Sequence, residues 1–204
     1  MKNKLIFFFS LSFLTFLNGQ FIHSVYVAPG INVYHYIPSH QNYKVSTNHK
    51  FKTNWQSTAG YRLKYTFNRF SIYTTVELKY SKIKFIQFSP SLDYSGELIN
   101  AEASLGFNYK IYKKINFGFD FKQIRELSAT GLFFKRYFDL DENYNGFSLS
   151  LLYQINKHFE VGSYYNLTLD SQYKSLSKTW GNTLDGFIHK VYLRNLDLRF
   201  YYNF

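Results

Sequence analysis

Apolar and polar residues alternate along most of this chain, as they do in strands with one apolar face. The pattern is clearest at the carboxyl end, where an apolar set alternates with a polar one. A period of two places the sets on opposite faces of a strand. The apolar set is Leu196, Leu198, Phe200, Tyr202 and Phe204, and the other is Asp197, Arg199, Tyr201 and Asn203.

The same alternation recurs upstream in three pairs of segments, each joined by a short polar turn. The turns lie at Asn68-Arg69, at 112–114 and at 156–158. Two alternating runs joined by so short a turn predict a β-hairpin. The apolar stripes include Tyr61, Leu63 and Tyr65 with Ile72, Val76 and Leu78; Leu105 and Phe107 with Phe117 and Phe119; and Leu149 and Leu151 with Val161 and Tyr165.

Two further strands complete the prediction. The first covers about 24–36, where Pro29-Gly30 predicts a kink or a bulge. The last covers about 187–204, where Val191 and Leu193 have the opposite parity to Leu196, which predicts a bulge near 194–195. Together with the three hairpins these make eight strands.

Long connections alternate with the short turns. They are predicted at about 37–52, 89–97, 128–143 and 171–186. Transmembrane barrels of the outer membrane have short periplasmic turns and longer extracellular loops. The chain is therefore predicted to be all-β, an eight-stranded antiparallel up-and-down transmembrane barrel. An even number of strands places both termini beside the short turns.

The first residues are typical of an export signal. Lys2 and Lys4 precede an apolar run over 5–17, and Gly19 supplies a small residue at a cleavage point. The run is too short for a stable membrane-spanning helix, although an uncleaved anchor helix is the alternative. We predict a signal peptide at 1–19 and a barrel domain at 20–204.

Composition narrows the class further. The chain has 20 Tyr and 23 Phe, which favour strands and crowd the aromatic girdles of membrane barrels. It has no Cys, so neither a disulfide nor a lipidated Cys is expected. The net charge of +11 is spread over predicted loops and strand faces. Anionic lipopolysaccharide is therefore a better counter-charge than nucleic acid, which an exported protein rarely meets.

Charged residues gather on the faces opposite the aromatic stripes. Counted back from the short turns, eight of them fall at middle depth, four positive and four negative. A buried charge needs a paired and hydrogen-bonded partner. We therefore predict a closed lumen, too narrow for more than a small leak, with a structural ion-pair network of Arg62, Glu77, Lys79, Glu102, Asp120, Lys122, Asp197 and Arg199.

In its signal peptide, alternating strands, turn–loop asymmetry and terminal Phe204, the chain resembles the small OmpA/OmpX-type outer-membrane barrels. The resemblance covers 20–204 and includes no diagnostic internal motif. It implies a structural or interaction protein of the bacterial outer membrane, without a cofactor, whose outer loops serve envelope integrity, adhesion or partner binding. It also implies contact with the barrel assembly machinery, through Phe200, Tyr202 and Phe204, and with other envelope proteins.

An enzyme is the rival class. Glu77 and Glu102 could be read as an acid–base pair, but an ion-pair network is favoured. Some barrels of this size remodel lipid A through a serine activated by a histidine. The candidates here lack a recognised spacing, and His35 suits an interfacial belt; they are His35, Ser39, His40 and His189.

Three weaker alternatives remain. His40 and His49 could bind a metal, but no carboxylate or thiol is spaced to complete the site. A soluble lipocalin-like barrel would place the aromatic stripes inside, which the terminal Phe204 and the turn–loop alternation argue against. Finally, polar residues in the outward stripes could mark a wall that faces another subunit of a larger complex; they are Ser57, Thr74 and Ser163.

Overall fold

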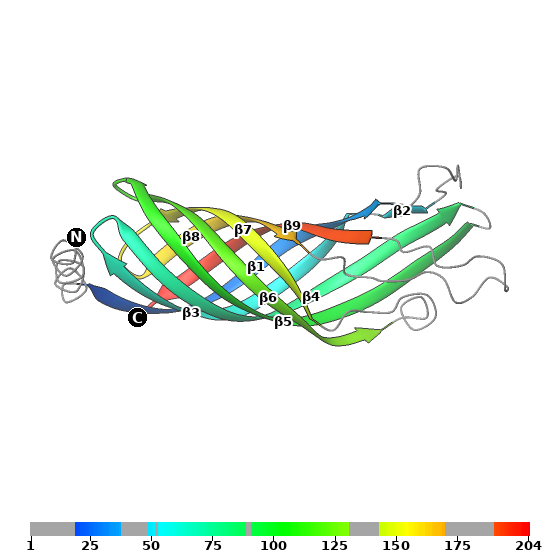
Figure 1. The fold of residues 1–204 in the computed structure, drawn as a ribbon, viewed down its shortest axis with the longest axis horizontal. Helices are drawn as coiled ribbons and strands as arrows, with labels where there is room; N and C mark the ends of the chain where they lie inside the picture. The colour runs from blue at the N-terminus through cyan, green and yellow to red at the C-terminus, as the bar shows by residue number, and fades with distance from the viewer. Residues whose placement is uncertain (1–18, 38–48, 52, 89–90, 131–142, 170–189) are drawn as a thin grey trace, which may run out of the picture.

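A computed structural model describes residues 19–37, 49–51, 53–88, 91–130, 143–169 and 190–204. Every regular element among them is a strand (Figure 1). The strands are β1 (Gln20–Ile37), β2 (His49–Phe51), β3 (Asn54–Phe67), β4 (Phe70–Phe88), β5 (Ser91–Tyr112), β6 (Ile115–Thr130), β7 (Asn143–Gln154), β8 (Phe159–Thr168) and β9 (Lys190–Asn203). Most of the predicted signal peptide, residues 1–18, lies outside the described residues.

The strands close into an antiparallel barrel. Around it the order is β4-β3-β1-β9-β8-β7-β6-β5, and β5 pairs with β4 again. The short β2 pairs with β4 at 85–87, above the part of β4 that pairs with β3, so it extends the same position in the wall. The predicted eight-stranded fold is confirmed. Closure gives every strand a hydrogen-bonding neighbour on each of its two sides. Hydrocarbon surroundings require this, because they offer no partner to an unpaired backbone group.

Short turns gather at one end of the barrel. β1 begins and β9 ends at this same end (Figure 1). Asn68 has a φ of 51°, in the left-handed region that a two-residue hairpin turn needs. In the last turn the Asn156 side chain accepts hydrogen bonds from the backbone N–H groups of His158 and Phe159, at 2.8 and 2.9 Å. These turns match the three predicted from sequence.

No bulge is present at Pro29-Gly30, where a kink or a bulge was predicted, or at 194–195, where a bulge was predicted. β1 keeps one register against β3 from Gln20 to Asn32, and its ladder to β9 only skips the pairs of Ala28 and Pro29. Proline has no N–H to donate, so a gap in the ladder suffices. β9 also keeps one register against β8. Leu193 is buried and faces inward, so its apolar character did not mark a change of face.

The predicted long connection at 89–97 is wrong. β4 continues to Phe88 and β5 starts at Ser91, so residues 91–97 pair with 82–88. This hairpin reaches farther than its neighbours at the end opposite the short turns (Figure 1).

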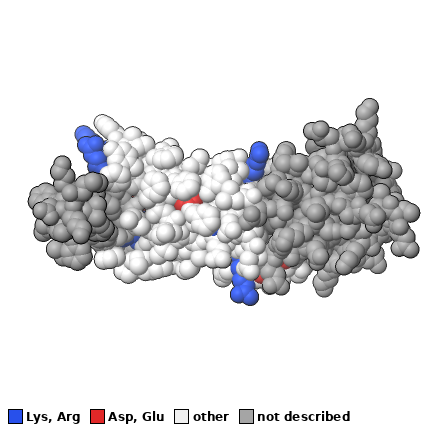
Figure 2. All heavy atoms as spheres, in the orientation of Figure 1, with Lys and Arg blue, Asp and Glu red and all other residues white. Residues whose placement is uncertain are grey.

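The two faces of the wall have opposite character. Outward side chains form an apolar band in which Val76, Leu105 and Phe200 are 58%, 65% and 47% exposed. In Figure 2 the described surface is mainly free of charge, with Lys and Arg near its two ends and a small acidic group near its middle. Inward positions hold polar and charged side chains, and these are buried. No helix among the described residues is long and apolar enough to cross a membrane.

Candidate functional site in the barrel lumen

Five cations and five anions are buried inside the described part of the barrel. They include all eight residues of the predicted network and add Lys64 and Glu160. Each comes from an inward position, so strand alternation alone brings them to one interior. The set is Arg62, Lys64, Lys79, Lys122 and Arg199 with Glu77, Glu102, Asp120, Glu160 and Asp197.

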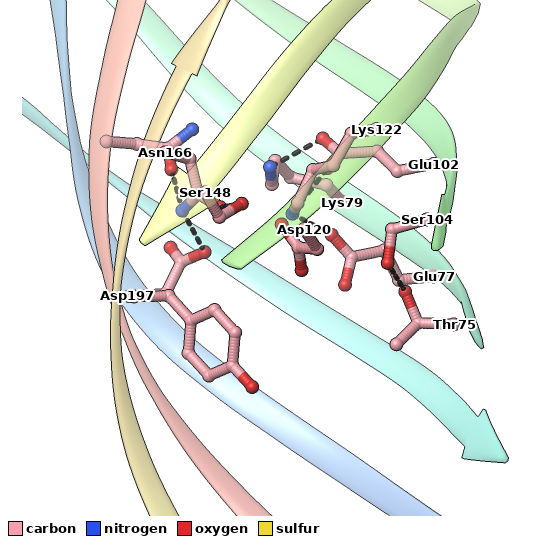
Figure 3. A network of polar contacts seen from close by, with 12 residues as sticks. Thr75, Glu77, Lys79, Glu102, Ser104, Asp120, Lys122, Ser148, Asn166 and Asp197 are labelled. Carbon is pink, nitrogen blue, oxygen red and sulfur yellow. Dashed lines mark hydrogen bonds and ion pairs between the residues drawn. The ribbon is translucent and has the colours of Figure 1, made fainter. Parts of the chain in front are cut away.

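A central cluster is built on two facing glutamates. Glu77 on β4 pairs in register with Glu102 on β5. Lys122 Nζ lies 2.9 Å from Glu77 Oε1 and 3.2 Å from Glu102 Oε2, so one cation bridges both carboxylates. Lys79 Nζ lies 2.5 Å from Glu102 Oε1. These side chains point toward one another in Figure 3.

Arg199 completes this cluster from the far wall. Its Nη1 lies 2.8 Å from Glu77 Oε2 and its Nη2 donates to Oε1 at 3.2 Å, a two-pronged contact. The Tyr26 hydroxyl also donates to Glu77. Because β9 and β4 are not neighbours, the contact crosses the lumen. The barrel is therefore tied together through its interior as well as around its wall.

A second cluster lies toward the short turns. Glu160 on β8 receives Arg62 Nη1 at 2.6 Å and Lys64 Nζ at 2.9 Å, both from β3. The Arg62 guanidinium lies 3.7 Å from the centre of the Tyr201 ring. Sequence reasoning missed Glu160, although its alternation with Phe159 and Val161 marks it as inward. It directly follows a turn, so it lies outside the middle-depth positions from which the network was predicted.

Polar side chains surround the remaining two carboxylates. Asp197 accepts hydrogen bonds from Gln56 and from Asn166, the latter at 2.9 Å. Ser148 donates to Asn166 at 2.6 Å (Figure 3). The Tyr73 hydroxyl donates to Asp120 at 3.3 Å. Hydrogen-bonding groups of this kind satisfy the lone pairs that ion pairs leave open.

Buried tyrosines fill the space between the clusters. Tyr201 donates to the Tyr164 hydroxyl at 2.8 Å, and the Arg199 guanidinium lies 4.1 Å from the centre of the Tyr164 ring. An eight-stranded barrel is only wide enough for side chains to fill its interior. The rings therefore pack beside the charged groups; the buried ones are Tyr26, Tyr73, Tyr144, Tyr164 and Tyr201.

The arrangement suits structure better than acid–base chemistry. The carboxylates of Glu77 and Glu102 both face cations, and their side chains are 0% and 1% exposed. A general acid or base must come within hydrogen-bonding distance of a substrate. Cations already engage both carboxylates, and ion-pair networks perturb carboxylates without catalysis.

The residues proposed for a lipid enzyme or a metal site cannot be compared with this geometry. Ser39, His40 and His189 lie outside the described residues, and only the backbone is described at His35 and His49. In the described segments no three His, Cys, Asp or Glu residues are grouped so as to hold a metal ion.

The carboxyl-terminal residues lie on the outer face at the short-turn end. Phe200, Tyr202 and Phe204 are 47%, 44% and 65% exposed. The Phe204 N–H donates to the His23 carbonyl at 3.0 Å, which fixes the last residue to β1. The Tyr202 ring packs edge-on against Phe204 and Phe159. The end of the chain is thus an ordered apolar surface.

The polar residues in the outward stripes do not form one patch. Ser57 and Thr74 are on neighbouring strands but far apart along them, and Ser163 is on β8. The Thr74 hydroxyl donates to the Ser104 carbonyl at 2.9 Å, so the wall itself satisfies it. These three residues therefore give no support to a protein-facing wall.

Comparisons with known proteins give a fold. No family model and no curated protein matches the chain. Neisserial surface protein A is 9% identical with a TM-score of 0.50, covering 92% of this chain and 99% of its own. OprG from Pseudomonas aeruginosa (9% identity, TM-score 0.48) covers 90% and 95%. Ail of Yersinia pestis (12%, TM-score 0.45) covers 91% and 99%. Together with the closed barrel of the structure, the likeness to Neisserial surface protein A shows that the chain has the fold of the small eight-stranded outer-membrane barrels, as the resemblance implied.

Proposed function

We propose that this protein is an integral barrel of the bacterial outer membrane that serves as a structural or interaction protein. One observation carries the proposal: apolar side chains cover the outside while paired charges occupy the inside. In a soluble barrel this orientation would expose the most apolar surface to water. In a bilayer it puts that surface in hydrocarbon.

Export and assembly follow from the two ends of the chain. The signal peptide at 1–19 would direct secretion, and the apolar surface of Phe200, Tyr202 and Phe204 would be recognised by the barrel assembly machinery. Since paired side chains fill the lumen, contact with partners falls to the outer loops. Envelope integrity, adhesion and the binding of other envelope proteins all suit such a surface.

Membrane fractionation with gel migration tests the proposal. A closed barrel resists detergent until heated, so the unheated protein should migrate faster than the heated one and be found in the outer-membrane fraction. Recovery as a soluble periplasmic protein would contradict the proposal.

A lipid-modifying enzyme is the alternative that the same cells can test. We expect the mass profile of lipid A to be the same with and without the protein, and unchanged by Ser39→Ala or His40→Ala. A shift by the mass of one acyl chain would replace the structural role with a catalytic one.

A further inference from the structure

A hollow in the outer wall lies over the central cluster of the lumen. It has a volume of about 730 Å³, lies across β3, β4, β5 and β6 and reaches β7 at Asn143. Gly60 and the inward-facing Glu77 and Glu102 are among the residues that line it. Small residues shape it: Ala59 on β3 and Ala101 and Ala103 on β5. Tyr61, Val76 and Leu78 line it as well and point outward. An elongated apolar group would fit against this surface.

Three polar side chains also line the hollow. Arg125 on β6 pairs in register with Ala101 on one side and with Asn143 on the other, and Gln123 pairs with Ala103. Arg125, Gln123 and Asn143 are all exposed on the outer face. Over the stretches that the structure describes, none of these three makes a hydrogen bond or an ion pair. Among the described residues, a cation and two amides therefore face outward without a partner.

Their height indicates the boundary of the bilayer. Arg125 lies ten residues from the start of β6, as Tyr80 does from the start of β4. At the usual rise and tilt, ten residues climb about 25 Å, the height of the apolar band of such barrels. Tyr80 contacts Trp55, with ring centres 5.5 Å apart, and Lys82 lies over the Trp55 ring. This group resembles an interfacial girdle.

We infer that the hollow binds a phosphorylated glycolipid of the outer leaflet. An acyl chain would lie over Ala101 and Ala103, and a phosphate would pair with the Arg125 guanidinium. The amides of Gln123 and Asn143 can both donate to and accept from sugar hydroxyl groups. Guanidinium groups suit phosphate because they donate two parallel hydrogen bonds. The inference rests on the proposed membrane location.

Charge and chemistry favour this occupant over a protein. A protein surface would need apolar area to fill the hollow and an anion at the level of Arg125, while an acylated phosphate has both in one molecule. Free phosphate would leave the apolar part of the hollow empty. Both rivals are outcomes of the test below.

The experiment titrates the purified, folded barrel in detergent with bis-phosphorylated lipid A and counts bound lipids by native mass spectrometry. Arg125→Gln removes the charge and should weaken binding about tenfold, the loss expected for a charged hydrogen bond. Ala103→Phe fills the hollow and should reduce binding comparably. Dephosphorylated lipid A should bind the unaltered protein as weakly as lipid A binds Arg125→Gln.

Two matched variants serve as controls. Arg194 is an exposed outward arginine nine residues from the end of β9, and Ser163 is a small outward residue on β8. Arg194→Gln and Ser163→Phe should bind lipid A as the unaltered protein does. All four residues point away from the lumen, so each variant should retain heat-modifiable migration. If one of Arg125→Gln and Ala103→Phe does not fold, the other is sufficient for the test.

Five results would overturn the inference. They are equal losses in Arg125→Gln and Arg194→Gln, unchanged binding in Arg125→Gln, full competition by inorganic phosphate, binding only of another protein, and a folded barrel that binds no lipid A. The last would not affect the proposed membrane location.

Discussion

Glu77 and Glu102 face each other from neighbouring strands, which would be costly without cations between them. Lys122 bridges the pair, while Lys79 and Arg199 each hold one of the two carboxylates. Removing one partner of a buried ion pair leaves an uncompensated charge, which costs more than the pair itself contributes. Each of these residues therefore depends on the others.

Glu77→Gln should lower the free energy of unfolding by about 3–5 kcal/mol, because Arg199 and Lys122 lose their common anion. Urea titration of the barrel in lipid vesicles measures this. Glu97→Gln is the matched control: Glu97 is an exposed glutamate on β5, and its loss should cost less than about 1 kcal/mol. Equal stability of Glu77→Gln and the unaltered protein would contradict a stabilising network.

At this scale, alternation determined which side chains point inward, because a period of two leaves only two faces. It did not determine their partners. Arg199 reaches Glu77 across the lumen, and no local pattern encodes contacts between strands that are not neighbours. Glu160 shows a different limit: its parity was readable, but it lies beside a turn, outside the middle depth at which the network was predicted.

The alternating apolar stripes of the sequence specify the strands, but the sequence indicates bulges and strand ends less clearly. The three turns followed from sequence, because short polar segments separate the alternating runs. The bulges predicted near Pro29 and Arg194 are absent, since both strands keep one register. The parity of Leu193 suggested a bulge near Arg194. Leu193 instead points inward, where apolar side chains also help to fill the lumen. Hydropathy did not indicate that the β4–β5 hairpin continues through the pairing of 82–88 with 91–97.

Gly106 shows how closely elements approach inside the barrel. A Cβ there would lie 2.5 Å from the Tyr73 ring and 2.6 Å from Asp120 Cβ. Gly106→Ala should therefore destabilise the barrel by about 1–3 kcal/mol through overpacking. Val76→Ile, which adds a methylene to the outward face, should have little effect. A larger loss of thermal stability in Val76→Ile than in Gly106→Ala, measured in vesicles, would contradict a tightly packed interior.

At the scale of the molecule, β9 closes the barrel by pairing with both β1 and β8. Phe204→Ala should leave most of the chain unassembled in the periplasm, because it removes the terminal apolar side chain of the proposed assembly signal. The heat-modifiable fraction in the outer membrane measures this. Phe159→Ala, at the same rim but outside the last strand, should assemble normally, and equal loss in both variants would refute a terminal signal.

The most direct test of the account asks which way β5 points its side chains. Because the chain has no Cys, spin labels can be attached to single introduced cysteines from Ile99 to Tyr109 in a lipid bilayer. Oxygen, which concentrates in hydrocarbon, should collide often with labels at outward positions such as Leu105, 65% exposed, and rarely at inward Ser104, 6% exposed. An alternation with the opposite phase, or none, would contradict the apolar outside and charged inside on which the proposed function depends.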